Sequence, residues 1–166
     1  MILFRYLTLA LLAVLTLCLP GLAPAQPRFD FRHTPGHLSK DVQAPRQALT
    51  LDLDPDREAF DGETTLTLSV RRPQAALVLH AHQLTPRRSV LVTAHGERAL
   101  TVQADEKAQT WRLVPADGRP LPAGRVTLQL AWTGRVQING SGLYRAPLRV
   151  QGVEQRVLAT QLQAVY

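Results

Sequence analysis

The chain has 166 residues, of which 45% are hydrophobic and 5% aromatic, and it contains one cysteine. Its net charge of +6 comes from 19 Lys and Arg residues against 13 Asp and Glu residues. The basic residues are scattered and not interleaved with aromatic residues, so they do not predict nucleic-acid binding, and a single cysteine excludes an intramolecular disulfide framework.

The first 25 residues have the pattern of a signal peptide. Arg5 is the only charge in this segment, and the apolar run that follows it ends at Leu19. That run is shorter than the roughly 20 residues that a membrane-spanning helix needs. Ala23 and Ala25 then provide the small-x-small pattern at which signal peptidase cleaves. We expect cleavage after Ala25 and a periplasmic or secreted product without stable membrane insertion; an uncleaved anchor is the alternative.

Residues 26–46 are rich in proline and show no hydrophobic period, which predicts an irregular lead-in. From residue 47 onward the apolar residues recur with period two, as in strands that bury one face and expose the other. The clearest runs place Leu, Val or Trp at every second position over residues 49–53, 66–70 and 126–132.

Shorter apolar runs fill the intervals and are separated by Gly, Pro, Asp and Asn, the residues that favour turns. No stretch beyond the signal segment has the apolar spacing of a helix. Strands at this spacing predict an all-β fold, a twisted and mostly antiparallel β-sandwich or open barrel, over residues 47–166.

Asp52, Asp54, Asp56 and Glu63 have the spacing of ligands in a calcium-binding EF-hand loop. Arg57 stands where that loop requires Gly, and the flanking runs predict strands rather than helices. We therefore interpret the segment as a hairpin turn with solvated carboxylates.

His80 and His82 would lie on one face of a predicted strand, a spacing that occurs in metal sites. His33, His37 and His95 could each supply a third ligand, but the sequence brings none of them close. We favour a strand end with one histidine packed and one exposed, and a small metal site is the weaker alternative.

The 166 residues contain no serine or cysteine nucleophile motif, phosphate-binding loop, dinucleotide fingerprint or HExxH motif. The sequence therefore predicts neither a catalytic residue nor a metal site within the chain.

Several segments, taken in order, resemble the start of the aminopeptidase N and puromycin-sensitive aminopeptidase family of zinc metallopeptidases. They are Leu49 to Asp56 with its Asp-Pro turn, Phe60-Asp61-Gly62, Trp132-Thr133-Gly134, Gly142-Leu143-Tyr144-Arg145 and Leu158-Ala159-Thr160-Gln161. The resemblance covers residues 38–166 and implies the saddle-like N-terminal β-domain of such an enzyme. Gly62 would allow a bend or bulge beside Phe60, and the glycines around Ser141 would permit positive φ and close backbone approach.

The resemblance also implies that Gln161 and Gln163 belong to a loop that reaches the catalytic cleft and lines the first substrate subsites. Gln163 would contact the α-amine of the peptide, to which its amide oxygen offers a neutral acceptor. A terminal strand with exposed glutamines is the alternative.

In that family the zinc-binding HExxH motif and the Gly-x-Met-Glu-Asn motif belong after the position of residue 166. We therefore expect a chain truncated before its catalytic domain, with that domain and peptide N-termini as partners. Zinc would be the cofactor of the full-length enzyme, while these residues alone would neither hold zinc nor hydrolyse peptides. The alternative function is a stand-alone secreted β-sandwich used for binding or docking.

Overall fold

The computed structural model describes residues 30, 34–36 and 38–162. The chain divides into two compact units, Met1–Pro35 and Gly36–Tyr166. In the first unit the Thr34 amide donates a hydrogen bond to the Asp30 carbonyl (3.0 Å). The predicted signal peptide, with Ala23 and Ala25, lies outside the described residues. No helix in the described part of the chain is long and apolar enough to cross a membrane.

All strands belong to the second unit. They are β1 (Val42–Asp52), β2 (Ala59–Val70), β3 (Leu77–His80), β4 (Leu84–Thr93), β5 (Gly96–Asp105), β6 (Thr110–Pro115), β7 (Gly124–Arg135), β8 (Gly142–Val150) and β9 (Val153–Gln161). The first seven form one sheet in the order β1-β2-β7-β4-β5-β6-β3, while β8 and β9 pair with each other. All pairings between these strands are antiparallel.

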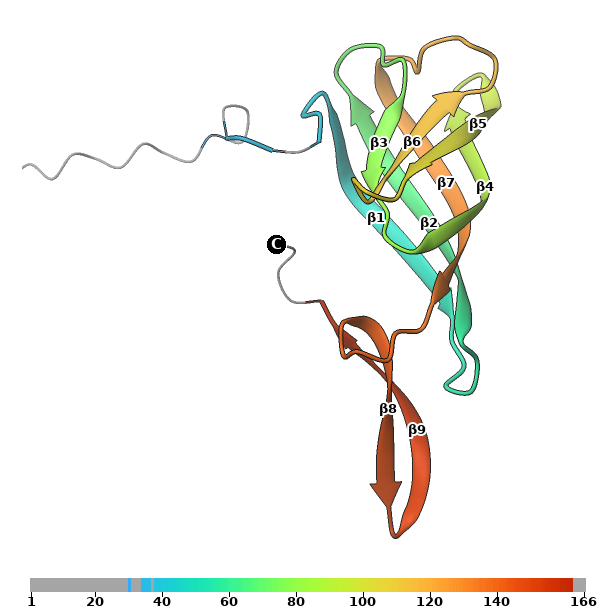
Figure 1. Ribbon diagram of the computed structural model, residues 1–166. Helices are drawn as coiled ribbons and strands as arrows, with labels where there is room; N and C mark the ends of the chain where they lie inside the picture. The colour runs from blue at the N-terminus through green and yellow to red at the C-terminus, as the bar shows by residue number, and fades with distance from the viewer. Residues whose placement is uncertain (1–29, 31–33, 37, 163–166) are drawn as a thin grey trace, which may run out of the picture. The chain divides into compact units, whose positions relative to one another are not determined.

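The seven-stranded sheet curls, so that β3 and β6 lie across from β1 and β2 (Figure 1). A cavity at the opening is lined by Leu49 of β1 and Leu79 of β3, which shows that the two edges of the sheet approach each other. This arrangement confirms the predicted all-β, antiparallel sandwich.

The core lies between the two layers of this curled sheet and consists mostly of leucine. On β2 every second residue from Phe60 to Val70 is buried, and on β7 every second residue from Val126 to Gly134 is buried. Both patterns follow the predicted period of two, because successive side chains of a strand point to opposite faces. The most deeply buried large side chains are Leu68, Leu91, Leu113, Leu121 and Leu128.

The leucines of residues 49–53, in β1 and just after it, do not follow the prediction. Leu49, Leu51 and Leu53 leave 51%, 36% and 41% of their surface exposed, so the expectation that this run buries one face was wrong. The physical reason is the place of β1 at the edge of the sheet: it has β2 on one side and no strand on the other.

β1 begins at Val42, so its first residues fall in the segment 26–46 that the sequence predicts to be irregular. Pro45 lies within the strand, and the pairing with β2 shifts register between Gln43 and Arg46. An edge strand accepts proline because its outward amide has no strand to bond. The prolines therefore do not show where the irregular segment ends and β1 begins.

Two aromatic residues face two glycines across β2 and β7. Phe60 pairs with Gly134 and Gly62 pairs with Trp132. The two rings meet edge to face, with centroids 5.7 Å apart and planes at 83°. The indole nitrogen of Trp132 donates a buried hydrogen bond to the Thr64 hydroxyl (3.1 Å).

The expected bulge at Gly62 does not form. β2 and β7 pair without a break from Ala59 opposite Arg135 to Val70 opposite Gly124. A Cβ at Gly62 would lie 2.4 Å from Cζ2 of Trp132. Glycine is required here because the indole ring occupies the space where a side chain would be, and not because the backbone bends.

Candidate functional site

The hairpin of β8 and β9 carries Gln161, the candidate substrate-binding residue that the structure describes. Its two-residue turn consists of Gln151 and Gly152, with φ of 51° and 82°. Two successive residues with positive φ are typical of the type I′ turn, whose twist matches that of paired strands. Val150 therefore pairs with Val153, and the register continues to Gly142 opposite Gln161.

The hairpin has one apolar and one largely polar face. Residues that pair across the strands share a face, as do alternate residues along each strand. One face holds Tyr144, Ala146, Leu148, Val150, Val153, Gln155, Val157 and Ala159. The other holds Leu143, Arg145, Pro147, Arg149, Glu154, Arg156, Leu158 and Thr160. Near the tip the apolar face is exposed: Leu148, Val150 and Val153 leave 44%, 41% and 61% of their surface accessible.

The backbone of Gln137 attaches the hairpin to the sheet. Its amide donates to the Leu143 carbonyl and its carbonyl accepts from the Arg145 amide, both at 2.9 Å. Leu143 and Leu158 pack against the main core beside these bonds. A two-stranded hairpin is marginally stable alone, so these contacts hold the base of the hairpin in place.

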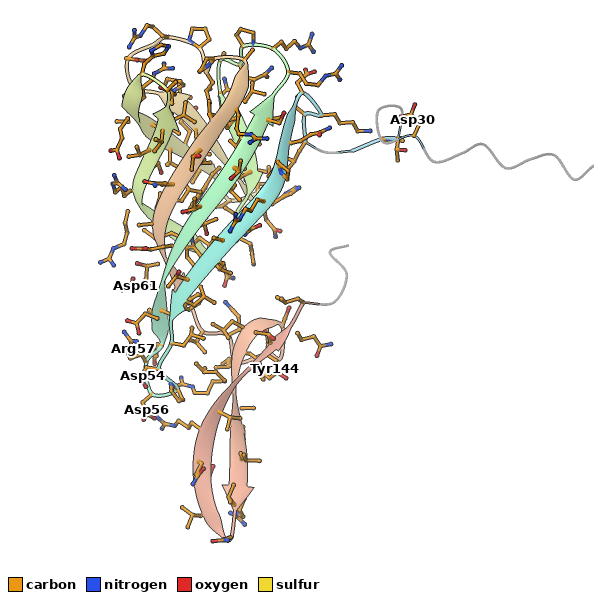
Figure 2. All side chains as sticks on the ribbon, turned by 180° about the vertical axis from the view of Figure 1, so that it is seen from behind. Asp30, Asp54, Asp56, Arg57, Asp61 and Tyr144 are labelled. Carbon is orange, nitrogen blue, oxygen red and sulfur yellow. The ribbon has the colours of Figure 1, made fainter. Side chains whose placement is uncertain are left out.

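The β1–β2 turn contacts the polar face of the hairpin. Arg156 forms an ion pair with Asp56 (3.1 Å), and Arg145 donates to the carbonyl of Pro55 (3.4 Å). Figure 2 shows Asp56 beside Asp54 and Arg57 at the end of this turn. The ion pair is exposed and therefore contributes little, about 0–1 kcal/mol.

Gln161 is exposed and ends β9 opposite Gly142, where the hairpin meets the sheet. Gln163, its expected companion, lies outside the described residues. Gly140 and Gly142 have φ of 76° and 64°, as the sequence predicts. A Cβ at either glycine would meet nothing within 4 Å, so the predicted close approach is absent.

A cavity of about 310 Å³ lies beside this junction. Its walls come from β2, the segment between β3 and β4, the end of β7 and the linker into β8. Sequence reasoning missed it because these stretches are far apart in the chain and share no motif. The only local signal is the polar linker around Asn139 and Ser141.

The carboxylates of the β1–β2 turn form the predicted hairpin turn. Asp54 caps the turn by accepting from the Asp56 amide (2.8 Å), and Asp52 accepts from the Arg57 guanidinium (2.9 Å). This hydrogen bond and the surrounding negative charge raise the pKa of Arg57. Arg57 thus occupies the position among the carboxylates that a cation would need.

His80 ends β3 and His82 lies beyond it, and both side chains are exposed. The expectation that one of them packs was wrong, because the strand ends before His82. Within the described ranges, no group of three or more His, Cys, Asp or Glu side chains is placed to hold a metal ion.

The most extensive charge network joins β5 to the loop after β6. Arg98 binds both carboxylate oxygens of Asp117 (2.7 and 3.0 Å), and Arg119 donates to the same carboxylate at 2.8 Å. Arg98 also donates to the Pro120 carbonyl (3.1 Å). The hydrogen bonds from Arg98 and then Arg119 hold the pKa of Asp117 well below its usual range. This network stabilises the loop and lies apart from the hairpin.

A comparison with models of protein families gives a match. The family model for the peptidase M1 N-terminal domain matches residues 38–166. That range includes all nine strands of the described chain. No curated protein matches the sequence.

Proposed function

The chain belongs to the family of peptidase M1 N-terminal domains, and we propose that it is the β-domain of a secreted zinc aminopeptidase that removes N-terminal residues from peptides. The match over residues 38–166 is the observation that carries this proposal. It agrees with the all-β, antiparallel fold of the described residues.

In this proposal the domain flanks the active-site cleft and presents Gln161 and Gln163 to the substrate. The attachment of the hairpin supports that role, since Gln137 and the packed side chains of Leu143 and Leu158 fix the end of β9. An amide side chain held on a fixed strand can accept a hydrogen bond from the α-ammonium of a peptide at little entropic cost.

Zinc does not fit the residues that the structure describes. Asp52 and Asp54, which have the spacing of metal ligands in the sequence, form ion pairs with Arg57. His80 and His82 are exposed, and among the described residues no third ligand is placed beside them. In this proposal zinc is held by the catalytic domain, and this domain's residues serve only to bind and orient the peptide.

The size of the native secreted product tests the proposal, using an antibody raised against residues 26–166. A product several times larger than 18.4 kDa that cleaves aminoacyl substrates and loses activity with a zinc chelator is the expected result. A product slightly smaller than 18.4 kDa without such activity would contradict it. That second result would favour a stand-alone β-sandwich, whose partner would then be sought on the exposed apolar face of the hairpin.

A further inference from the structure

The cavity beside the hairpin junction has a lining that suits one class of ligand. We propose that it binds a small carboxylate carried on an apolar group. This proposal is independent of the aminopeptidase function, since it concerns a pocket within the described chain. At about 310 Å³ the cavity lies at the lower end of the range for small-molecule sites.

The polar part of the lining contains no carboxylate. It consists of His82, Gln83, Arg135, Gln137, Asn139 and Ser141. An anion entering the cavity would therefore meet no negative side chain. It would find a guanidinium, an imidazole, amides and a hydroxyl, all of which can donate hydrogen bonds.

Arg135 provides the positive charge. In the described part of the chain its guanidinium has no ion-pair partner, whereas those of Arg57, Arg87 and Arg98 pair with carboxylates. An arginine fork binds a carboxylate with two parallel charge-assisted hydrogen bonds, which are stronger than neutral ones. Arg135 is thus available to an external carboxylate, unlike the arginines whose guanidinium groups already pair with a carboxylate.

Hydrogen bonds within the lining use the side-chain oxygens of Gln83 and Asn139 and leave the NH2 groups of these two residues as donors. The Gln83 side-chain oxygen accepts from the Gln137 amide group, and the Asn139 side-chain oxygen accepts from the Ser141 backbone amide (3.3 Å). Gln83 also has a φ of 54°, an uncommon conformation for a residue other than glycine. Such conformations persist where surrounding contacts hold them, and they are enriched at binding sites.

The remaining walls are apolar. Phe60 is buried with 7% of its surface exposed, and the half-buried Leu84 and Leu143 pack against the same core. These side chains would contact the hydrocarbon part of the ligand while the carboxylate meets Arg135. The combination matches an apolar amino acid with a blocked amine, a peptide C-terminus or another apolar acid.

An NMR titration of the 166-residue chain with N-acetyl-leucine tests the proposal. We expect saturable shifts at the backbone amides of Gln83, Gln137 and Gly142. The dissociation constant should be on the order of 1 mM, given a ligand of about a dozen non-hydrogen atoms. N-acetyl-leucinamide, which has the same shape and no charge, should bind about tenfold more weakly.

Two variants assign the charge preference to this cavity. Arg135→Gln should weaken binding of N-acetyl-leucine about tenfold and bring it close to that of the amide. The matched control is Arg125→Gln, at the other exposed end of β7, which should bind like the original chain. An unchanged thermal unfolding curve for Arg135→Gln would show that the loss is not due to misfolding.

The source of the carboxylate is resolved by a second probe, the α-amide of N-acetyl-aspartate. Tighter binding of N-acetyl-leucine would assign the cavity to carboxyl termini and apolar acids, and tighter binding of the aspartate compound would assign it to acidic side chains. Equal binding of N-acetyl-leucine and its amide, equal binding by Arg135→Gln and the original chain, or no saturable shift at the cavity would each overturn the proposal.

Discussion

Gly62 lies directly opposite Trp132 on the neighbouring strand, and the indole ring occupies the space in which any other residue would place its Cβ. The reverse pair, Phe60 opposite Gly134, lies two residues away, and a Cβ at Gly134 would come within 2.6 Å of the Phe60 ring. Each aromatic ring thus covers the glycine of the other strand. The Phe-x-Gly and Trp-x-Gly segments are two halves of one packing unit.

Gly62→Ala should destabilise the chain by about 1–3 kcal/mol, since the added methyl group must displace the indole of Trp132. Chemical denaturation measures the change. Gly36→Ala is the control, because its Cβ would meet only Lys40 at an ordinary 3.6 Å. The penalty should shrink in a Trp132→Leu background, and equal losses for Gly62→Ala and Gly36→Ala would contradict the packing argument.

Thr64→Val should cost about 1–3 kcal/mol because it leaves the buried indole N–H of Trp132 without an acceptor. Valine keeps the shape of threonine, so the loss reports the hydrogen bond more than the packing. Thr65→Val, on the exposed face of the same strand, should change the free energy of unfolding by less than about 0.5 kcal/mol. The prediction fails if the two substitutions have the same effect.

Asp117→Asn should lower the melting temperature at pH 7 and have little effect in strong acid. The pKa of Asp117 is lower in the folded chain than its unfolded value of about 3.9, so the ionised carboxylate stabilises the fold above that pH. This contribution declines as pH falls below about 4 toward the folded pKa. Thermal unfolding at several pH values measures it.

The matched control for this pH dependence is Glu106→Gln, an exposed carboxylate in the turn between β5 and β6. Its melting temperature should differ little from that of the original chain at any pH. A difference between Asp117→Asn and the original chain that stays constant from pH 7 to pH 2 would show that Asp117 does not contribute through its charge.

Leu158→Ala should loosen the hairpin without unfolding the sheet. Leu158 packs against the core from the hairpin, and the ion pair of Arg156 with Asp56 is too exposed to replace it. Amide hydrogen exchange should accelerate across β8 and β9 and stay unchanged in β2 and β7. Val157→Ala, on the opposite face of β9, should have a smaller effect, and equal exchange in both variants would argue against the role of Leu158.

Gln163→Glu in the proposed full-length aminopeptidase should lower KM about five- to tenfold for substrates with a free α-amine, since a charge-assisted bond replaces a neutral one. Initial rates with aminoacyl nitroanilides measure this. Gln155→Glu makes the same chemical change on the hairpin, away from the end of β9, and should leave KM unchanged. An unaltered KM for Gln163→Glu would remove this residue from the proposed substrate subsite.

The sequence was sufficient to predict the buried face of strands that have a paired strand on each edge. Leu66 to Val70 and Val126 to Trp132 show period two because β2 and β7 pair on both edges and bury one face. Leu49 to Leu53 has the same period, yet the pattern does not show that β1 is an edge strand. Burial depends on what lies beside a strand, which a local pattern does not encode.

The same limit applies to the candidate site. Gly62 suggested a bulge, because the sequence does not reveal that Trp132 is its partner across the strands. Gln161 was identified through a resemblance over residues 38–166, and the structure adds its position opposite Gly142. The cavity beside that pair could not be predicted, since its walls come from four parts of the chain that only the sheet topology brings together.

The exposed edge of β1 also bears on how copies of this chain meet one another. An unpaired strand edge can bond to a strand of another molecule, and proteins resist this with proline or an irregular register. Pro45 and the register shift between Gln43 and Arg46 provide such protection in the first half of β1 only. The second half, with Leu49 and Leu51 exposed, has none, so intermolecular β-pairing and aggregation should begin there.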